Sequence, residues 1–351
     1  MKVIGIIGSY GNIAVTTILE KYFYIVKKKI KTYNLNGMFV KRESDDNDDY
    51  NYTYDPSILE AYIRKDRNSG IDYVIVKIEP EIVIHKAFKH VLHFDLLVLT
   101  KIKREFSYNF HTYNAYLEAI KTIIGAHSNV LIDSENIIEF NDVYTKTYST
   151  NIDANYKLNI IKSNLNGTKF EYNKLRMDTH LITDYHATNI ICTIALLENL
   201  DDFNFRKYRM LIRKIKFPND FESINYKGKT ILFHRASIVF NLPLEEIIKT
   251  MDHYNFRIII NDFKVYDTDL QNQNSREIRK AKTLYLVSNQ KNRLKTFIKN
   301  ILKDRSFNIK MIDAEKEEFL KILKHSKKEE VLVIFTSSRI QYQRIKEAIC
   351  G

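Results

Sequence analysis

Cysteine, glycine and proline are scarce in this sequence, and tryptophan is absent. The two cysteines, Cys192 and Cys350, form neither a disulfide framework nor a metal-type cluster, which is typical of a reducing compartment. Nine glycines and four prolines among 351 residues argue against long disordered linkers. No apolar run approaches the length of a membrane span, and no secretory leader opens the chain. We therefore expect a cytoplasmic protein with no membrane partner.

Positive charge is in excess, with 55 lysines and arginines, 43 acidic residues and a net charge of +12. Such an excess occurs in proteins that bind nucleic acid, anionic membranes or anionic ligands. Here the lysines are spread among acidic residues, and no DNA- or RNA-binding motif accompanies them. The sequence therefore does not favour nucleic acid as a partner.

The first nineteen residues contain the most informative pattern. An apolar strand at residues 3–7 runs into a turn with Gly8 and Gly11, and an apolar-periodic helix follows. Strand, glycine turn and helix together build a phosphate cradle in α/β proteins, because the turn's N–H groups and the helix N-terminus face an anion. A P-loop places lysine and then serine or threonine after its last glycine. Asn12 and Ile13 stand there instead.

The rest of the chain predicts an α/β fold in two domains. Apolar strands alternate with helices in the first half, as in a mostly parallel sheet of the P-loop type. Asn166-Gly167 predicts the turn of an added antiparallel hairpin. With a boundary near Pro218, we expect a first domain over residues 1–216 and a smaller, Rossmann-like α/β domain over residues 217–351.

Eight segments, in the same order, resemble the Mur ligase family of ATP-dependent amide ligases that add amino acids to peptidoglycan precursors. The opening GIIGSYGNIAVTT is similar to a family glycine loop of the form GITGTNGKTTT, and YHATNIICTIALL resembles a Phe-Asn-x-x-Asn helix. The other matches are Asp55-Pro56 with Leu59, DYVIVKI, the segment 94–121, NGTKFEY, FPNDFE and VLVIFTSSRIQYQ. The resemblance covers the family's central and C-terminal domains, and is strongest to the ligase that adds the third stem-peptide residue. The family's N-terminal UDP-substrate domain has no counterpart in the sequence.

The resemblance implies a nucleotide site, and the departures from it fall on the groups that perform the chemistry. It implies that six residues contact the nucleotide, with the last of them near the base: Gly8, Ser9, Gly11, Asn12, Ile13 and Asn189. The strand glutamate that binds Mg²⁺ in the family falls on Lys77, or on Glu79 in a shifted alignment. Without a lysine or a metal-binding hydroxyl in the turn, we expect no Mg²⁺ site, no catalytic residues and at most residual ATP binding.

Three hypotheses for function follow. The first is a degenerate Mur-ligase-like protein, a pseudo-ligase that binds a nucleotide, a cell-wall precursor or a partner ligase, or that self-associates. The second is a working ATP-dependent acid–amino acid ligase of the cell-wall type with an altered P-loop. The third is a dinucleotide-binding Rossmann protein, in which Glu43 would hold the ribose.

Overall fold

A computed structural model shows that the chain forms two compact units, each described below by itself. The first comprises Met1–Lys162, Gly167–His180 and Asp184–Ile215, and the second comprises Ser163–Asn166, Leu181–Thr183 and Lys216–Gly351. The structure describes residues 1–9, 11–35, 39–42, 51–52, 56–78, 93–102, 112–125, 127–140, 145–217, 222–235, 250–251, 254–261, 280–287, 308–312, 316–336 and 343–347.

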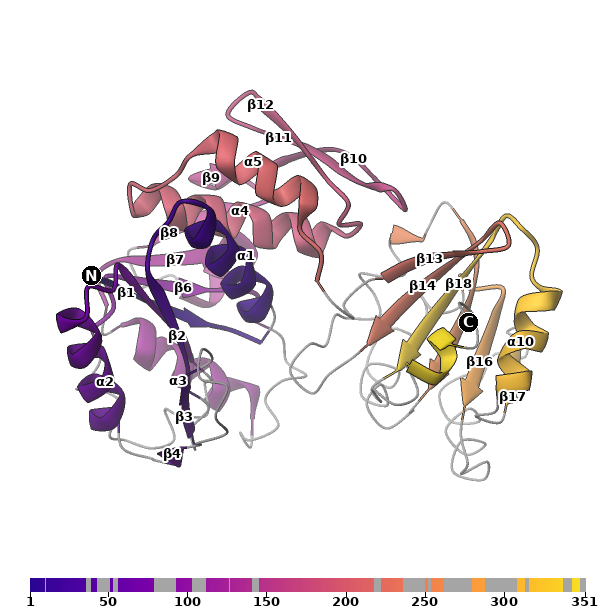
Figure 1. Cartoon of the computed structure of the whole chain (residues 1–351), viewed down its shortest axis with the longest axis horizontal. Coiled ribbons are helices and arrows are strands. Elements are labelled where there is room, and N and C mark those ends of the chain that lie inside the picture. Colours follow the sequence, from indigo (N-terminus) through magenta and orange to yellow (C-terminus); the bar gives the residue numbers. More distant parts are fainter. Residues whose placement is uncertain are drawn as a thin grey trace. The chain divides into compact units, whose positions relative to one another are not determined.

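The first unit is built on a nine-stranded sheet with the order β4-β3-β2-β5-β1-β6-β7-β8-β9 (Figure 1). Seven neighbouring strands are parallel, which confirms the mostly parallel sheet predicted from the sequence. They are β2 (Ile30–Leu35), β5 (Tyr73–Ile78), β1 (Lys2–Ile7), β6 (Leu96–Leu99), β7 (Val130–Asp133), β8 (Lys146–Ser149) and β9 (Tyr156–Lys157). The edge strands β3 (Phe39–Arg42) and β4 (Asn51–Tyr52) are antiparallel.

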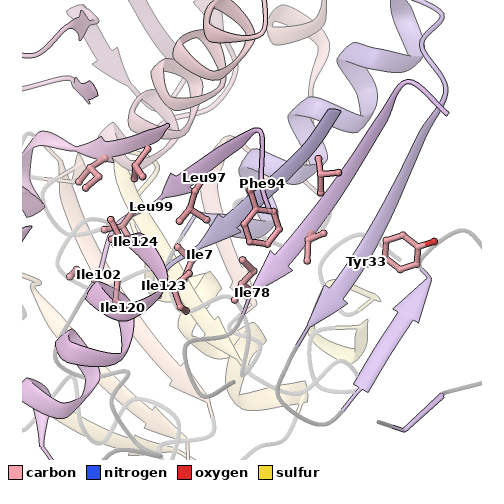
Figure 2. Packing of buried hydrophobic residues seen from close by; sticks show 14 of the residues in the cluster. Ile7, Tyr33, Ile78, Phe94, Leu97, Leu99, Ile102, Ile120, Ile123 and Ile124 are labelled. Carbon is pink, nitrogen blue, oxygen red and sulfur yellow. The ribbon is translucent and has the colours of Figure 1, made fainter. Parts of the chain in front are cut away.

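Helices cover both faces of this sheet, which explains why its central strands are mostly apolar. On one face, α1 (Asn12–Ile25) packs against α4 (Asp184–Asn199) and α5 (Phe205–Lys214) (Figure 1). On the other face, α2 (Pro56–Asn68) and α3 (Tyr113–Ile124) contribute to a core that also contains Ile7, Leu97 and Leu99 (Figure 2).

Strand β2 was not predicted from the sequence. Helix α1 ends at Ile25, and Lys27 adopts a left-handed conformation with φ 63°. The next strand is held from a distance, since Tyr33 donates a hydrogen bond of 2.6 Å to Asp66 of α2 and Lys31 pairs with the same carboxylate. These partners lie more than thirty residues further along the chain, so the local pattern does not show the strand.

A small antiparallel sheet, β10-β11-β12, is added to the first half of the chain. Strands β10 (Asn159–Asn164) and β11 (Gly167–Tyr172) meet at the predicted Asn166-Gly167 turn, where Gly167 has φ 125°. Strand β12 (Leu175–Thr179) was not predicted. It joins the sheet to α5, because the Thr179 hydroxyl donates to the carbonyl of Ile212 at 2.9 Å.

The second unit contains a six-stranded sheet with the order β13-β14-β18-β15-β16-β17. All its strands are parallel except β13. The bounds are β13 (Glu222–Tyr226), β14 (Lys229–Arg235), β15 (Asn255–Asn261), β16 (Thr283–Val287), β17 (Ile309–Ile312) and β18 (Glu330–Thr336), with helix α10 at Lys316–His325. Among the described residues, no helix is long and apolar enough to cross a membrane.

Candidate functional site

The candidate site lies where the carboxyl ends of β1, β6 and β7 meet. These three strands are neighbours in the sheet, and they end next to Gly8, Thr100 and Asp133. Ligands of open α/β sheets bind at this edge, because the loops that leave parallel strands converge there. Helix α4 adds Asn189, which is buried against the same turn.

The glycines of the turn are required by its conformation and by its close neighbours. Gly8 has φ 149° and Gly11, the N-cap of α1, has φ 88°, which disfavours any side chain at either position. A Cβ on Gly8 would overlap Thr100 Oγ1, and one on Gly11 would overlap Asn189 Oδ1. The structure thus brings Asn189 together with the turn residues, a grouping that the family resemblance implied but that no spacing in the sequence indicates.

Two of the turn's N–H groups already have acceptors within the protein. The Ser9 N–H donates to the carbonyl of Lys101 at 3.1 Å, and the Ile13 N–H donates to Asn12 Oδ1 at 2.7 Å. The Asn12 amide, only 5% exposed, also donates to the Gly8 carbonyl at 3.4 Å. An incoming phosphate would have to displace these contacts to reach the N–H groups that form the cradle.

The two positions that follow the turn's last glycine, Asn12 and Ile13, supply neither the cation nor the metal-binding hydroxyl of a P-loop. Ile13 offers no oxygen to a metal, and Lys77 lies on β5 in register with Ile6, two residues before Gly8. Within the described part of the chain, no three histidine, cysteine or acidic side chains gather as metal ligands. Glu43, the expected ribose contact of a dinucleotide site, and Glu79, the alternative to Lys77 in the alignment, lie outside the described residues.

Two carboxylates at the end of β7 were not predicted as site residues. Asp133 is 2% exposed, and burial raises its pKa to about 6, although the Glu135 N–H donates to its Oδ1 at 3.0 Å and favours the ionised form. Glu135, the second residue of the 3-10 helix η4 (Ser134–Phe140), pairs with Lys101 at 2.9 Å. The sequence signal that could have identified this cluster is an aspartate, Asp133, at the end of an apolar strand.

Two buried polar atoms near this edge have no hydrogen-bond partner within the described part of the chain. They are Ser134 Oγ, directly after β7, and Asn189 Nδ2, beside the glycine turn. A buried polar atom without a partner costs about 1–3 kcal/mol, so native proteins generally satisfy such atoms with water or a ligand. Asn189 is therefore a candidate contact for a polar ligand in this turn.

The parallel sheet with its glycine turn, the added hairpin and the second sheet are consistent with the central and C-terminal domains of Mur ligases. A MurF ligase from Thermotoga maritima in complex with ADP matches with a TM-score of 0.68 and 14% identity, over 99% of this chain and 79% of that chain. A pseudomurein peptide ligase type C from Methanothermus fervidus gives the same values. A third match is UDP-N-acetylmuramoyl-L-alanyl-D-glutamate–2,6-diaminopimelate ligase. Its TM-score is 0.66 and its identity 13%, over 99% of this chain and 78% of that chain. No protein-family model and no curated protein matches the sequence. At these identities, the likeness shows the fold.

Proposed function

We propose that this chain is a pseudo-ligase with the Mur ligase fold, which binds a nucleotide or a cell-wall precursor without ATP-driven ligation. The observation that supports this most directly is the Asn12 side chain, which lies buried in its own turn and bonds to Gly8 and Ile13. It occupies the position at which the resembled loop has its lysine. Any associated catalytic activity would then come from a partner ligase.

The proposal follows from what phosphoryl transfer requires. Positive charge must reach the β- and γ-phosphate oxygens, and a metal must bridge them. Asn12 is neutral, Ile13 cannot bind Mg²⁺, and two of the turn's N–H groups already donate to protein oxygens. The loss of one preorganised contact of this kind costs on the order of 10²–10³ in rate. Several such losses together leave a binding site rather than a ligase site.

Nucleotide is the first ligand to test, since the similar MurF ligase was solved with ADP and Asn189 Nδ2 is buried and unpartnered beside the turn. Calorimetry with ADP, ATP and NADH, each with and without Mg²⁺, measures the affinities. We expect adenine nucleotide to bind independently of Mg²⁺ and NADH not to bind. Mg²⁺-dependent release of ADP in the presence of amino acids and muropeptide precursors would overturn the pseudo-ligase proposal.

A restored turn provides the complementary experiment. The double variant Asn12→Lys with Ile13→Thr returns the charge and the hydroxyl, so ATP affinity should rise about tenfold or more and become Mg²⁺-dependent. The matched variant Asn12→Gln with Ile13→Val changes the same positions without adding charge or hydroxyl, and should leave affinity near that of the native chain. Equal affinity in both variants would contradict the role assigned to the turn.

An active ATP-dependent amide ligase is the second candidate, and Asp133 is the observation that favours it. A carboxyl whose pKa is raised to about 6, beside an ion-paired Glu135, is the type of group that active sites use as an acid or base near neutral pH. If the native chain releases ADP and Asp133→Asn abolishes that release, the ligase hypothesis replaces the pseudo-ligase.

The dinucleotide-binding hypothesis is not supported by the strand order. In the dinucleotide fold the strand after the first helix lies beside the first strand. Here β5 lies between β1 and β2, so the end of β2 is not next to the glycine turn's strand.

A further inference from the structure

Helix α5 presents a face that consists almost entirely of cations. Its ten residues, FRKYRMLIRK, contain five basic side chains and no acidic one. Tyr208, Leu211 and Ile212 are buried, so the basic residues are left exposed on the opposite side. We call this set the basic face, and it consists of Arg206, Lys207, Arg209, Arg213 and Lys214.

The basic face is not neutralised by the protein itself. Arg213 pairs with Asp178 at 3.1 Å, whereas the other four cations have no acidic partner within the described part of the chain. The neighbouring strands β11 and β12 differ, because Lys169 lies opposite Asp178 and Glu171 lies opposite Arg176 in the ladder. The charge excess is therefore a local property of α5 and not of the whole surface around it.

An exposed apolar side chain accompanies these charges. Met210 lies within the basic face and is 47% exposed. Helix α1 packs against α5 and exposes Lys21 and Tyr24, the latter at 84%. The two helices are tied together where the Asn204 N–H donates to the Tyr22 hydroxyl at 2.7 Å. Met210 is thus exposed among the cations of α5. Tyr24 follows Tyr22 by two residues, more than half a helical turn, so it does not lie on the side of α1 that meets α5.

We propose that the basic face of α5 docks on an anionic phospholipid bilayer. Lysine and arginine are attracted to anionic headgroups. Exposed Met210 can enter the headgroup layer while the neighbouring cations reach the phosphates. A nucleic acid is favoured less, because sites for single strands combine a charged groove with several stacking aromatics, whereas the exposed residues of α5 include no aromatic side chain. This differs from the sequence expectation that no membrane is a partner.

Co-sedimentation of the full chain with lipid vesicles tests the proposal. One set of vesicles contains phosphatidylcholine alone and the other contains equal parts of phosphatidylcholine and phosphatidylglycerol. We expect binding only to the anionic vesicles, and a decline as salt shortens the Debye length. Each cation near such a surface contributes about fivefold, so Arg206→Glu with Arg209→Glu should weaken binding by at least about 25-fold.

Matched variants separate this surface from general charge. Lys65→Glu with Arg67→Glu makes the same change in net charge on exposed residues of α2, on the other face of the sheet, and should bind within about threefold of the native chain. Met210→Ser keeps the charge and should weaken vesicle binding severalfold without affecting any binding to an oligonucleotide. Circular dichroism checks that each variant is folded.

Three outcomes would overturn the proposal. They are absence of binding to the anionic vesicles, equal weakening by the α2 and α5 variants, and binding to an oligonucleotide that is stronger than vesicle binding and depends on the same two arginines.

Discussion

The buried carboxyl of Asp133 makes the stability of the first unit depend on pH in an unusual direction. Its pKa is raised from 3.8 to about 6, mainly because burial disfavours the charged form. As pH rises from about 4 to about 6, the unfolded chain loses this proton while the folded chain retains it. The free energy of unfolding therefore falls over this range. At 1.36 kcal/mol for each pKa unit, the loss reaches about 3 kcal/mol above about pH 6.

The substitution Asp133→Asn removes this dependence with little change in shape. The amide oxygen can still accept the bond from the Glu135 N–H, which the carboxylate accepts at 3.0 Å. We therefore expect the variant to match the native protein near about pH 4 and to be more stable by up to about 3 kcal/mol near about pH 8. Hydrogen exchange of the β7 amides along a urea series measures the unfolding free energy of this part of the protein.

The variant Asp201→Asn is the control, because it makes the same chemical change at an exposed residue. Asp201 has φ 59°, a conformation that asparagine also adopts readily. The free energy of unfolding of the Asp201→Asn variant should stay within about 0.5 kcal/mol of the native value at every pH. If Asp133→Asn also follows the native curve, or is less stable at high pH, then the assigned effect of burial on this carboxyl is wrong.

Two further predictions concern a turn and a buried ion pair. Gly11→Ala places a Cβ against the side-chain amide of Asn189 at φ 88°, so urea unfolding should show a loss of about 2 kcal/mol or more in the free energy of unfolding. The control Gly70→Ala has φ 70° with open space around it, and should cost only about 1 kcal/mol. Glu330 is buried and accepts from Lys282 at 2.5 Å and Arg257 at 3.0 Å, so Glu330→Gln should cost about 3 kcal/mol. Burial by itself raises the pKa of Glu330, but those cations and the Lys327 N–H together outweigh it and lower the pKa. The stability that the ion pair contributes is therefore present at neutral pH and lost in acid. Acid titrations of the native chain and of the glutamine variant should therefore converge, and parallel curves would contradict this reasoning.

Much of the fold was accessible from the sequence because its main elements have local signatures. Strands buried on both faces contain continuous apolar runs, as in residues 73–76 and 96–99. The Asn166-Gly167 pair marks a hairpin because glycine adopts the positive φ that the turn requires. Strand β2 was missed because its partners on α2 lie far away in the sequence.

The candidate site was accessible only in part, for the same reason. The glycine turn is continuous in sequence, so Gly8, Gly11, Asn12 and Ile13 could be grouped from their spacing. The pairing of Lys101 with Glu135 joins the ends of two different strands, and no spacing rule predicts it. The raised pKa of Asp133 likewise depends on burial by surrounding elements that the sequence does not place.

The sequence by itself determined an α/β chain with a glycine turn that lacks the lysine and hydroxyl of a P-loop. Those properties are local, since they depend on apolar periodicity and on the residue types at adjacent positions. Only the tertiary structure decided that β5 lies between β1 and β2, that Asn189 closes on Gly11, and that the Asn12 amide folds back on its own turn. Strand neighbours and buried contacts are selected by the packing energy between segments that are far apart in the sequence. No single stretch of the chain determines that energy.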